Sequence, residues 1–589
     1  MNNTRSRLIL FFLIFSLTGT CFCQLPVTVN IEGRILDATT SEPLPFVSIQ
    51  IKSTRKGTIS DGSGYFSIVI TSLSDTLVCT SVGYQVTLLV PKPGKKYYEI
   101  RMSENTQLLN EIVITSKEID LYQLIQTCAK KDHSQRLNAK SYYQLKSFVN
   151  GRQIELVESY FNAGISGYDL ESLSLKSGRI ALQVFDHQFF ISTESSAAIT
   201  KLSLINNNAG FPGSPLEMPV NRMKKVYKLE LAKVYLDDKG QEIYLVDFTP
   251  VVDDATLFSG KLWINHLKKQ VVKVQLFAPG TRIHPFKPLF TSDSIRRIDL
   301  DITKTFSEIG GRMYFNHVDF NYNVYYKSRN DSAYVVNTKA ILYAYAPGES
   351  FLLPKFEFTD INHTDYRKIN AMPYNVFFWE YLDEFRLIDR KDQNRRFYED
   401  EATMTNKTMF DDNPFIDKGL LEHPYMPWDS SGRITISEFI PDSTDLNTSD
   451  APFTTDLYNL SVKTFLDVNP SGDSLHWMSA TIFDPYETFY HLPVDDTVLC
   501  FINLYFDIME VQRRFLEKAL SNGVQTIEQF NKTYNEFMEE RLVVSRQFLK
   551  EVNRGINQSA MLQWNAYVRQ HLGIDNIRIF RPYPAVHQE

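Results

Sequence analysis

The stretch GTISDGSGYFSI, residues 57–68, places a turn signal between two apolar segments and decides how the first part of the chain folds. Glycines that follow an aspartate supply the positive φ angles of a tight turn, while the carboxylate accepts hydrogen bonds from the local backbone. A calcium loop would need several more oxygen ligands at alternating positions. No further Asp or Glu occurs in this stretch besides Asp61, so we predict a hairpin turn that holds no cation.

Around this turn, residues 27–103 alternate apolar and polar positions in short runs, which is typical of a small antiparallel β-sandwich. The segments IEGRILD (31–37), PLPFVSIQI (43–51), the turn itself and SVGY (81–84) together resemble the carboxypeptidase-regulatory-like domain. The resemblance implies a scaffold without catalytic residues that heads many exported and outer-membrane proteins of Bacteroidota. We assign residues 24–116 to this domain.

The chain begins with a segment that has the composition of a cleaved export signal. Two arginines precede the apolar run of residues 8–19, which is short for a membrane span, and small residues stand before Gln24. We therefore assign residues 1–23 to a signal peptide. No later apolar run reaches membrane-spanning length. The predicted location is the periplasm or the periphery of the outer membrane.

Charge and cysteine content exclude some classes of partner and site. Residues 1–23 carry two basic residues and no acidic one, so their removal changes the net charge from −7 to −9. A mildly acidic chain without a basic patch argues against nucleic acid as a partner. Cys79, Cys128 and Cys500 remain, none in a CxxC pair, and we expect them to be small buried apolar residues.

The 589 residues suggest about three to five domains, and we predict a multidomain α+β protein. Residues 117–139 form a connecting helix in this prediction, because apolar residues recur there at helical spacing. Residues 140–347 contain long alternating segments typical of an antiparallel sheet. Residues 348–450 are rich in Pro, Asp and Ser and are interpreted as linker. Residues 451–589 predict a mainly helical domain.

The middle segment leaves two interpretations open. Its strand order, with residues 260–275 as an inner hairpin, resembles the half-barrel of periplasmic lipoprotein carriers and related envelope sensors. That resemblance implies a concave apolar face able to hold a lipid or peptide tail. The alternative is a sheet closed by its own helices.

In the linker, an acidic cluster is either a cation site or a part of a solvated loop: Asp411, Asp412 and Asp417.

Capping signals locate the helices of the last segment. Acidic residues at Asp495 and Asp496 suit the start of a first helix, and Gly523 suits its end. Thr526 and Gln529 form the pattern of a capping box for a second helix. We expect the second helix to direct the following side chains inward: Ile527, Phe530, Tyr534, Phe537 and Phe548.

The first of these helices, FINLYFDIMEVQRRFLEKAL (501–520), resembles a bacterial domain of unknown function regarded as a zinc peptidase. Its hallmark helix reads H-E-Q-x-H-F-D-I-x-E, and H-G-x-N follows downstream with Trp seven positions after the Asn. The following residues of this chain match it: Phe506, Asp507, Ile508, Glu510, Arg514, Gly555, Asn557 and Trp564.

The metal ligands of that family are replaced. Zinc hydrolysis on one helix needs two His at i and i+4 and a Glu that takes a proton from the bound water. Here Phe501 and Tyr505 stand at the His positions, Ile502 at the Glu position and Arg554 at the downstream His position. We therefore predict no catalytic residue, no metal and no other cofactor.

The leading hypothesis is a non-catalytic cell-envelope protein that binds a protein, peptide or lipid partner. One alternative is a hydrolase with a relocated active site, built from His476, His491, Asp507 and Glu510. These histidines are interpreted as structural, and the two acids as helix-surface groups or groups behind the former site. A lipid carrier or sensor that works through the middle sheet is the other alternative.

Overall fold

The computed structural model describes the larger part of the chain in two compact units. One unit holds residues 29–105, and the other holds the described residues from 120 onward except for 237, 239 and 387. The predicted borders at 116, 139, 347 and 450 stay predictions. The described residues are 29–54, 57–105, 120–131, 135–183, 195–206, 210–237, 239–252, 255–288, 292–328, 332–359, 364–382, 384–385, 387, 403–404, 425–435, 457–472, 474–490, 493–524 and 526–583.

The first unit is a sandwich of two small sheets around an apolar core. Strand order is β4-β1-β7 in one sheet and β3-β2-β5-β6 in the other. All pairs are antiparallel except the parallel pair β1–β7, which joins the first and the last strand of the unit. The predicted sandwich is confirmed. The strands are β1 (Val29–Asp37), β2 (Ser48–Ile51), β3 (Gly57–Ile59), β4 (Tyr65–Ile70), β5 (Leu77–Thr80), β6 (Thr87–Leu89) and β7 (Tyr97–Met102).

The stretch at residues 57–68 forms the predicted turn between β3 and β4, but the predicted hairpin is wrong, because the two strands do not pair and belong to different sheets of the sandwich. The Asp61 carboxylate accepts hydrogen bonds from the Ser63 backbone N–H (2.8 Å), the Ser63 hydroxyl (2.8 Å) and the Tyr65 N–H (2.9 Å). Gly64 has φ +75°, a conformation that residues with a Cβ rarely adopt. Asp61 thus stabilises its own turn through the backbone.

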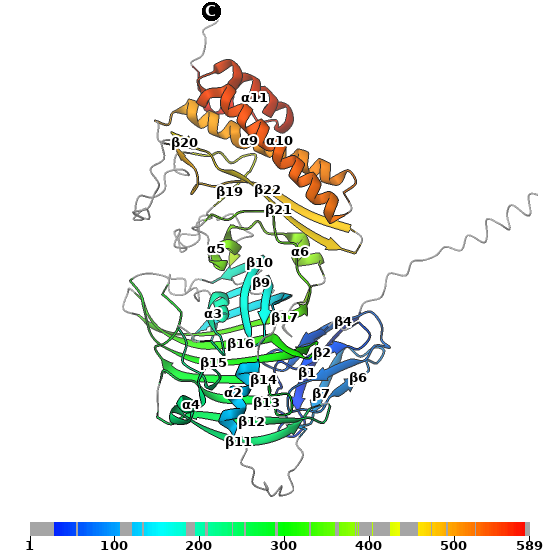
Figure 1. Ribbon diagram of the computed structural model, residues 1–589. Coiled ribbons are helices and arrows are strands. Elements are labelled where there is room, and N and C mark those ends of the chain that lie inside the picture. The colour runs from blue at the N-terminus through cyan, green and yellow to red at the C-terminus, as the bar shows by residue number, and fades with distance from the viewer. Residues whose placement is uncertain are drawn as a thin grey trace, which may run out of the picture. The chain divides into compact units, whose positions relative to one another are not determined.

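The second unit is built on a curved sheet of eleven antiparallel strands (Figure 1). Its order is β11-β12-β13-β14-β15-β16-β17-β8-β9-β10-β18. Strand β8 begins at Leu137, inside the segment predicted as a connecting helix, while β9 and β10 lie within the predicted sheet segment. The strands recognised in the sequence begin only with β11. The strands are β8 (Leu137–Val149), β9 (Arg152–Ser166), β10 (Asp169–Leu182), β11 (Tyr227–Leu236), β12 (Glu242–Pro250), β13 (Ser259–Asn265), β14 (Gln270–Thr281), β15 (Ser294–Ile309), β16 (Arg312–Lys327), β17 (Ala333–Pro347) and β18 (Thr403–Met404).

The strand order explains how one face of the sheet is covered. β10 and β11 are consecutive in the chain but lie near opposite edges of the sheet, so the connection between them has to cross a face. Its described residues fold as α3 (Ser195–Lys201), a 3₁₀ turn (Pro215–Glu217) and α4 (Val220–Val226). With α2 (Leu121–Lys131), they pack against the inward-facing side chains of the strands.

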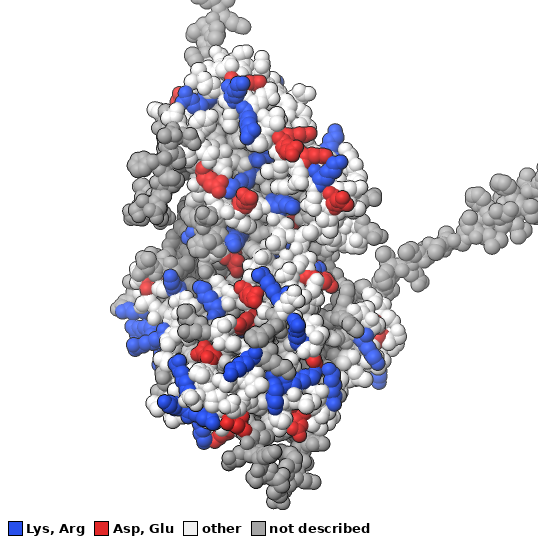
Figure 2. All heavy atoms as spheres, in the orientation of Figure 1, with Lys and Arg blue, Asp and Glu red and all other residues white. Residues whose placement is uncertain are grey.

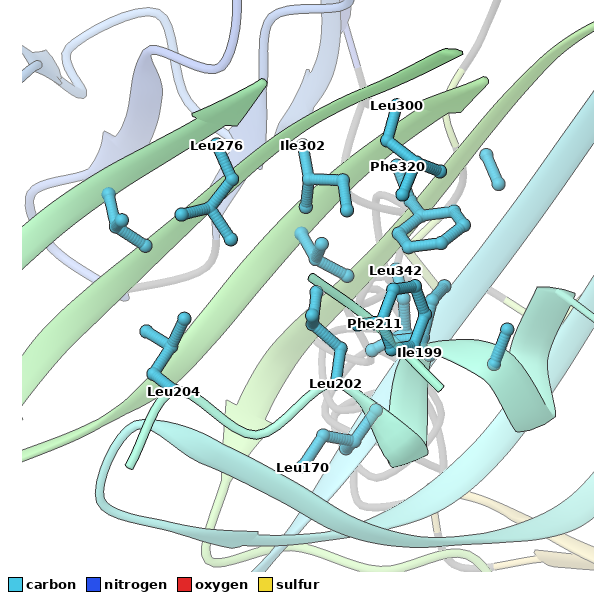
Figure 3. Packing of buried hydrophobic residues seen from close by; sticks show 14 of the residues in the cluster. Leu170, Ile199, Leu202, Leu204, Phe211, Leu276, Leu300, Ile302, Phe320 and Leu342 are labelled. Atoms are coloured by element: carbon cyan, nitrogen blue, oxygen red, sulfur yellow. The ribbon is translucent and has the colours of Figure 1, made fainter. Parts of the chain in front are cut away.

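Figure 3 shows this packing from close by, with apolar side chains of the crossing segment against those of β14 to β17. All of these side chains are at most 3% exposed. Of the two interpretations, the described residues favour a sheet whose inner face is filled by its own chain. The labelled residues are Leu170, Ile199, Leu202, Leu204, Phe211, Leu276, Leu300, Ile302, Phe320 and Leu342.

A buried lysine fastens the crossing segment to the sheet. Lys304 of β15 is fully buried, and its ammonium donates to the Leu202 carbonyl (3.0 Å) and lies 3.9 Å from the Asp169 carboxylate. Burial lowers the pKa of Lys304 to about 8, and Asp169 opposes that shift. Asp169 also accepts from the Ser203 hydroxyl (2.7 Å), so one carboxylate holds both the lysine and the segment.

Two short helices wrap around the β10 side of the sheet. In α5 (Asp365–Ala371), Ile369 belongs to the inner core. In α6 (Val376–Tyr381), Phe378 and Trp379 pack on the opposite face, where both rings contact Tyr160 of β9. The segment before β18 therefore covers both faces of this part of the sheet.

The last part of the second unit places helices on a small sheet of order β19-β22-β21 (Figure 1). Asp495 caps α9 and a Thr526 capping box begins α10, as the sequence predicts. Ile527 is 42% exposed, so its predicted inward position is wrong. The elements are β19 (Met426–Pro427), β20 (Tyr458–Asn459), β21 (Val462–Ser471), β22 (Ser474–Phe483), β23 (Phe489–Tyr490), α9 (Asp496–Ser521), α10 (Ile527–Val552), a 3₁₀ turn (Asn553–Gly555), α11 (Gln558–Leu572) and α12 (Asn576–Phe580).

Three further properties concern the described residues. None of their helices is long and apolar enough to cross a bilayer. On the face drawn in Figure 2, acidic and basic side chains are interspersed over the α9–α11 region. Cys79, Cys128 and Cys500 are buried, as predicted.

Candidate functional site

The three α9 positions that replace the zinc ligands lie in one apolar cluster. Phe501, Ile502 and Tyr505 are 0%, 1% and 6% exposed. The rings of Phe501 and Tyr505 both stack on Phe548 of α10, with centroids 5.6 and 5.8 Å away. The Tyr505 hydroxyl lies 2.9 Å from the Ser545 hydroxyl oxygen. These side chains therefore form the α9–α10 interface.

Arg554 lies in the turn between α10 and α11, which packs on the first turn of α9. Asn553, Arg554 and Gly555 all have positive φ, of 44°, 60° and 91°. A Cβ at Gly555 would lie 2.8 Å from Cγ2 of Thr497 and 3.7 Å from Cβ of Phe501, so only glycine permits this approach. The structure thus brings the turn that carries Arg554 next to Phe501, although the two are far apart in the sequence.

The residues at these positions do not fit a zinc ion. Phenyl and aliphatic groups have no lone pair for zinc, and the Tyr505 hydroxyl pairs with Ser545. The guanidinium of Arg554 is a cation and would repel a zinc ion. Within the described ranges, no three His, Cys, Asp or Glu side chains gather as a set of metal ligands. The absence of a metal stays a prediction, and we derive no chemical step through one.

Asp507 of α9 is fully buried and joins three segments of the C-terminal region. Its carboxylate accepts from Nε1 of Trp428 and from Nδ2 of Asn576, both at 2.7 Å, and Arg433 lies 3.6 Å away. Burial raises the pKa of Asp507, although the Arg433 charge and the two hydrogen bonds act against the rise. Its contacts suit a residue that holds α9 in place.

Glu510, one turn further along α9, is 2% exposed and held by two arginines. Arg513 donates to both carboxylate oxygens at 2.7 Å, Arg514 donates at 2.9 Å, and the Thr481 hydroxyl donates at 2.8 Å. Burial alone would raise the pKa of Glu510, but the two arginines bring it below its usual value. Neither acid is therefore a helix-surface group, because both are buried in fixed networks.

The remaining predicted candidates do not join these networks. The His476 ring of β22 stacks on Phe377, with centroids 3.8 Å apart. Its described contacts include neither Asp507 nor Glu510. His491 and the acidic cluster of the linker lie outside the described residues. The relocated-site alternative therefore gains no geometric support from His476.

Sequence reasoning missed a second arginine beside the former ligand positions. Arg541 of α10 donates through Nη2 to the Val462 carbonyl, while its buried Nε has no hydrogen-bond partner. Its charge acts on the Tyr505 hydroxyl, which places it near α9. One signal was present in the sequence, since Arg541 follows Phe537 by four residues and precedes Phe548 by seven, on the apolar face of its helix.

Two tyrosines lie close to Phe501 or Arg554. Tyr458 of β20 and Tyr490 of β23 have ring centroids 5.6 Å apart, and the Tyr458 ring lies 6.0 Å from that of Phe501. Burial raises the pKa of both hydroxyls, and the positive charge of Arg554 opposes the rise in each.

Comparison with solved structures finds likenesses at low identity. A LolA superfamily protein from Nitrosomonas europaea is 13% identical with a TM-score of 0.16, and the match covers 37% of this chain and 91% of that chain. An outer membrane lipoprotein-sorting protein domain from Vibrio parahaemolyticus is 9% identical with a TM-score of 0.17. That match covers 41% of this chain and 94% of the other. A chain of the MucA/MucB complex of Pseudomonas aeruginosa is 10% identical with a TM-score of 0.15. That match covers 38% of this chain and 93% of the other. At these TM-scores the likenesses support no conclusion about this chain.

Comparison of sequences gives one result for the first unit. No curated protein matches the chain. The model of one family matches residues 31–114, which include most of β1 and all of β2 to β7. The match lies within the predicted domain of residues 24–116, whose borders stay predictions. The N-terminal part of the chain, residues 31–114, is thereby identified as a CarboxypepD_reg-like domain.

Proposed function

We propose that this chain is a non-catalytic protein of the cell envelope that binds a protein or peptide partner through its C-terminal helical region. The observation that carries the proposal is the packing of Phe501, Ile502 and Tyr505 in the α9–α10 core. A hydrolytic centre at this place would need lone-pair donors around an open position. The side chains present supply an apolar interface instead.

The fixed contacts of the two α9 acids support the same proposal. A general base must reach a substrate or a water molecule and exchange a proton with it. The Asp507 and Glu510 carboxylates instead accept hydrogen bonds from five side chains of the protein. Their hydrogen-bonding capacity is used for holding α9 against its neighbours.

A lipid partner inside the sheet is less well supported than a protein partner on the surface. The crossing segment fills the inner face of the sheet with apolar side chains. A cavity between β8, β9, α3 and α5 measures about 30 Å³, enough for one or two water molecules. Binding pockets for larger organic ligands measure about 300–1,000 Å³. Within the described part of the sheet, an acyl chain on the inner face would have to displace side chains of the crossing segment.

The envelope location rests on two features of the N-terminal part. Residues 1–23 have the composition of an export signal. Residues 31–114 match the CarboxypepD_reg-like family, and domains of this kind stand at the start of many exported proteins. Together they support a location outside the cytoplasm.

Hydrolysis of peptides tests the proposal. The purified chain is incubated with a mixture of unstructured peptides and micromolar zinc, and the products are identified by mass spectrometry. We expect no cleavage above the protein-free control, because the ligand positions carry no zinc-binding group. Cleavage that a chelator abolishes would show an active metallopeptidase and refute the proposal.

A double variant controls for contaminating peptidases. Asp507→Asn with Glu510→Gln removes the two α9 acids available to an acid/base mechanism. Activity that this variant retains would come from a contaminant or from another part of the chain. Activity that disappears, while the circular dichroism spectrum stays unchanged, would assign catalysis to α9.

A further inference from the structure

Strand β6 of the first unit exposes apolar side chains along the edge of its sheet. It is the last strand in the order β3-β2-β5-β6. Val86, Leu88 and Val90, within and directly beside this strand, are 41%, 59% and 57% exposed. Leu89 packs against the core of the sandwich instead. Because successive side chains of an extended segment point to opposite faces, the three exposed residues share the outer face.

The outer face next to Leu88 carries no charge. Leu88 pairs with Val78 of β5, Val78 pairs with Gln50 of β2, and Gln50 pairs with Gly57 of β3. Residues that lie directly opposite each other in a sheet direct their side chains to the same face. The row that crosses the sheet from its β6 edge is therefore neutral, and it ends in an exposed aliphatic side chain.

A basic loop follows this edge directly in the chain. Lys92, Lys95 and Lys96 lie between β6 and β7, and all three are exposed. Residues 76–98 contain no Asp or Glu, whereas the whole chain has a net charge of −7. The edge and its loop thus form a cationic segment in a chain that is acidic as a whole.

Hydrogen bonds to one buried tyrosine fix the shape of the loop. The Tyr98 hydroxyl accepts from the Lys92 N–H (2.6 Å) and donates to the Lys95 carbonyl (3.1 Å). The Lys95 N–H donates to the Lys92 carbonyl (3.1 Å), and Gly94 between them has φ +77°. The backbone of the loop is therefore tied to the sandwich, while its lysine side chains extend into solvent.

We propose that the β6 edge attaches the first unit to the surface of an anionic lipid bilayer. Its aliphatic side chains enter the boundary between headgroups and acyl chains, and its ammonium groups contact the lipid phosphates. The inference goes beyond the proposed function, because it concerns the first unit and not the C-terminal helices. The β6 edge consists of Val86, Leu88, Val90, Lys92, Lys95 and Lys96.

Charge and size favour a bilayer over a protein as the occupant. Three neighbouring lysines without an acid among them complement a surface of anionic phosphates, which attracts each basic residue that comes close to it. A stable protein interface buries about 800 Å² and about 20–30 residues on each side. Three aliphatic side chains at the edge of a short strand are a small part of such an interface, whereas a bilayer requires no matching shape.

Sedimentation with lipid vesicles tests the attachment. Residues 24–589, the chain expected after export, are mixed with phosphatidylcholine vesicles that contain or lack phosphatidylglycerol. We expect about tenfold or more tighter binding to the anionic vesicles, because three lysines act on their surface. Added salt should weaken this binding, because it screens exposed charges. Equal binding to both vesicles, or binding to neither, would overturn the proposal.

A triple variant connects the binding to the loop. Lys92→Gln, Lys95→Gln and Lys96→Gln together should lower the affinity for the anionic vesicles about tenfold or more. Circular dichroism checks that the variant is folded. The matched control removes three exposed lysines of the second unit and should leave the affinity nearly unchanged: Lys225→Gln, Lys228→Gln and Lys532→Gln. Equal losses in the two triple variants would contradict a specific role of the loop.

A polarity-sensitive dye on Leu88→Cys reports whether the edge enters the bilayer. The native thiols in residues 24–589 are buried, so the dye attaches at position 88. Its emission should shift to shorter wavelengths on the anionic vesicles. Val69→Cys is the control, since Val69 is 41% exposed on β4 of the other sheet, and a dye there should keep its emission. An unchanged emission at position 88 would contradict insertion.

An acidic protein partner would give a different pattern of results. Binding of poly-L-glutamate that depends on the three loop lysines, without a shift of the dye at position 88 on vesicles, would replace the bilayer by an acidic polypeptide. Because the β6 edge lies in the first unit, a failure of lipid binding leaves the non-catalytic function of the α9 region standing. Peptide hydrolysis, in turn, would refute that function and leave the β6 edge untouched.

Discussion

Replacing Lys176 by alanine is expected to lower the free energy of unfolding of the second unit by about 3–5 kcal/mol, because the change leaves a buried carboxylate without its cation. Lys176 and Asp467 are each 1% exposed, and their charged atoms lie 2.5 Å apart. The pair joins β10 of the large sheet to β21 beneath the C-terminal helices. The measurement is denaturant unfolding followed by circular dichroism.

The local structure explains why this lysine points away from the sheet. The β9–β10 register shifts between Leu175 and Ser177, so Lys176 is the extra residue of a β-bulge. Its ammonium also donates to the carbonyls of Leu352 (2.7 Å) and Val468 (3.0 Å). All three ammonium protons thus have an acceptor, and truncation of the side chain removes three interactions at once.

Two further variants make this prediction specific. Lys176→Met combined with Asp467→Leu removes both charges and should recover most of the lost stability, since apolar pairs replace buried ion pairs at little cost. Lys228→Ala removes an exposed partner of Glu230 and should leave the unfolding free energy nearly unchanged, because solvent screens an exposed ion pair. A loss below 1 kcal/mol in Lys176→Ala would show that the pair does not hold these elements together.

Phe501→Ala is the second change with a large expected effect, a loss of about 3–5 kcal/mol of unfolding free energy. The side chain is fully buried between Phe548 and the Tyr458 ring, so its removal leaves a cavity that α9 and α10 cannot close. Chemical unfolding with the same optical readout measures the loss.

Phe515→Ala on the same helix is the matched control for this prediction. Phe515 is 44% exposed, and its truncation should cost less than about 1 kcal/mol. If Phe501→Ala cost no more than Phe515→Ala, the space around the former ligand positions would be open and able to admit a ligand. That result would weaken the non-catalytic interpretation directly.

The sequence predicted those parts of the fold that depend on local chemistry. The Asp61 turn, the Asp495 cap and the Thr526 capping box each depend on residues within four positions of one another. The parallel β1–β7 pair and the path from β10 to β11 depend on contacts between distant segments, which turn signals do not encode. Ile527 was placed inward because it continues an apolar pattern, but the first turn of α10 extends beyond the core.

The candidate site was likewise predictable only where it depends on local spacing or on a motif. Helical spacing predicted that Phe501 and Tyr505 share a face, and a motif resemblance pointed to Arg554 in the turn beside them. The position of Tyr458 and Tyr490 beside Arg554 was not predicted, because the two tyrosines come from two short strands. The position of Arg541 near Tyr505 was not predicted either, because Arg541 lies on a second helix. Burial of Asp507 and Glu510 was also missed, since charged residues on a long helix usually face water.

The zinc content of the purified full chain tests the central claim most directly. After incubation with zinc and removal of loosely bound ions by desalting, elemental mass spectrometry gives the number of zinc ions per chain. The packing of Phe501, Ile502 and Tyr505 predicts a value far below one. One tightly held zinc ion per chain would contradict the account and would place a metal centre elsewhere in the protein.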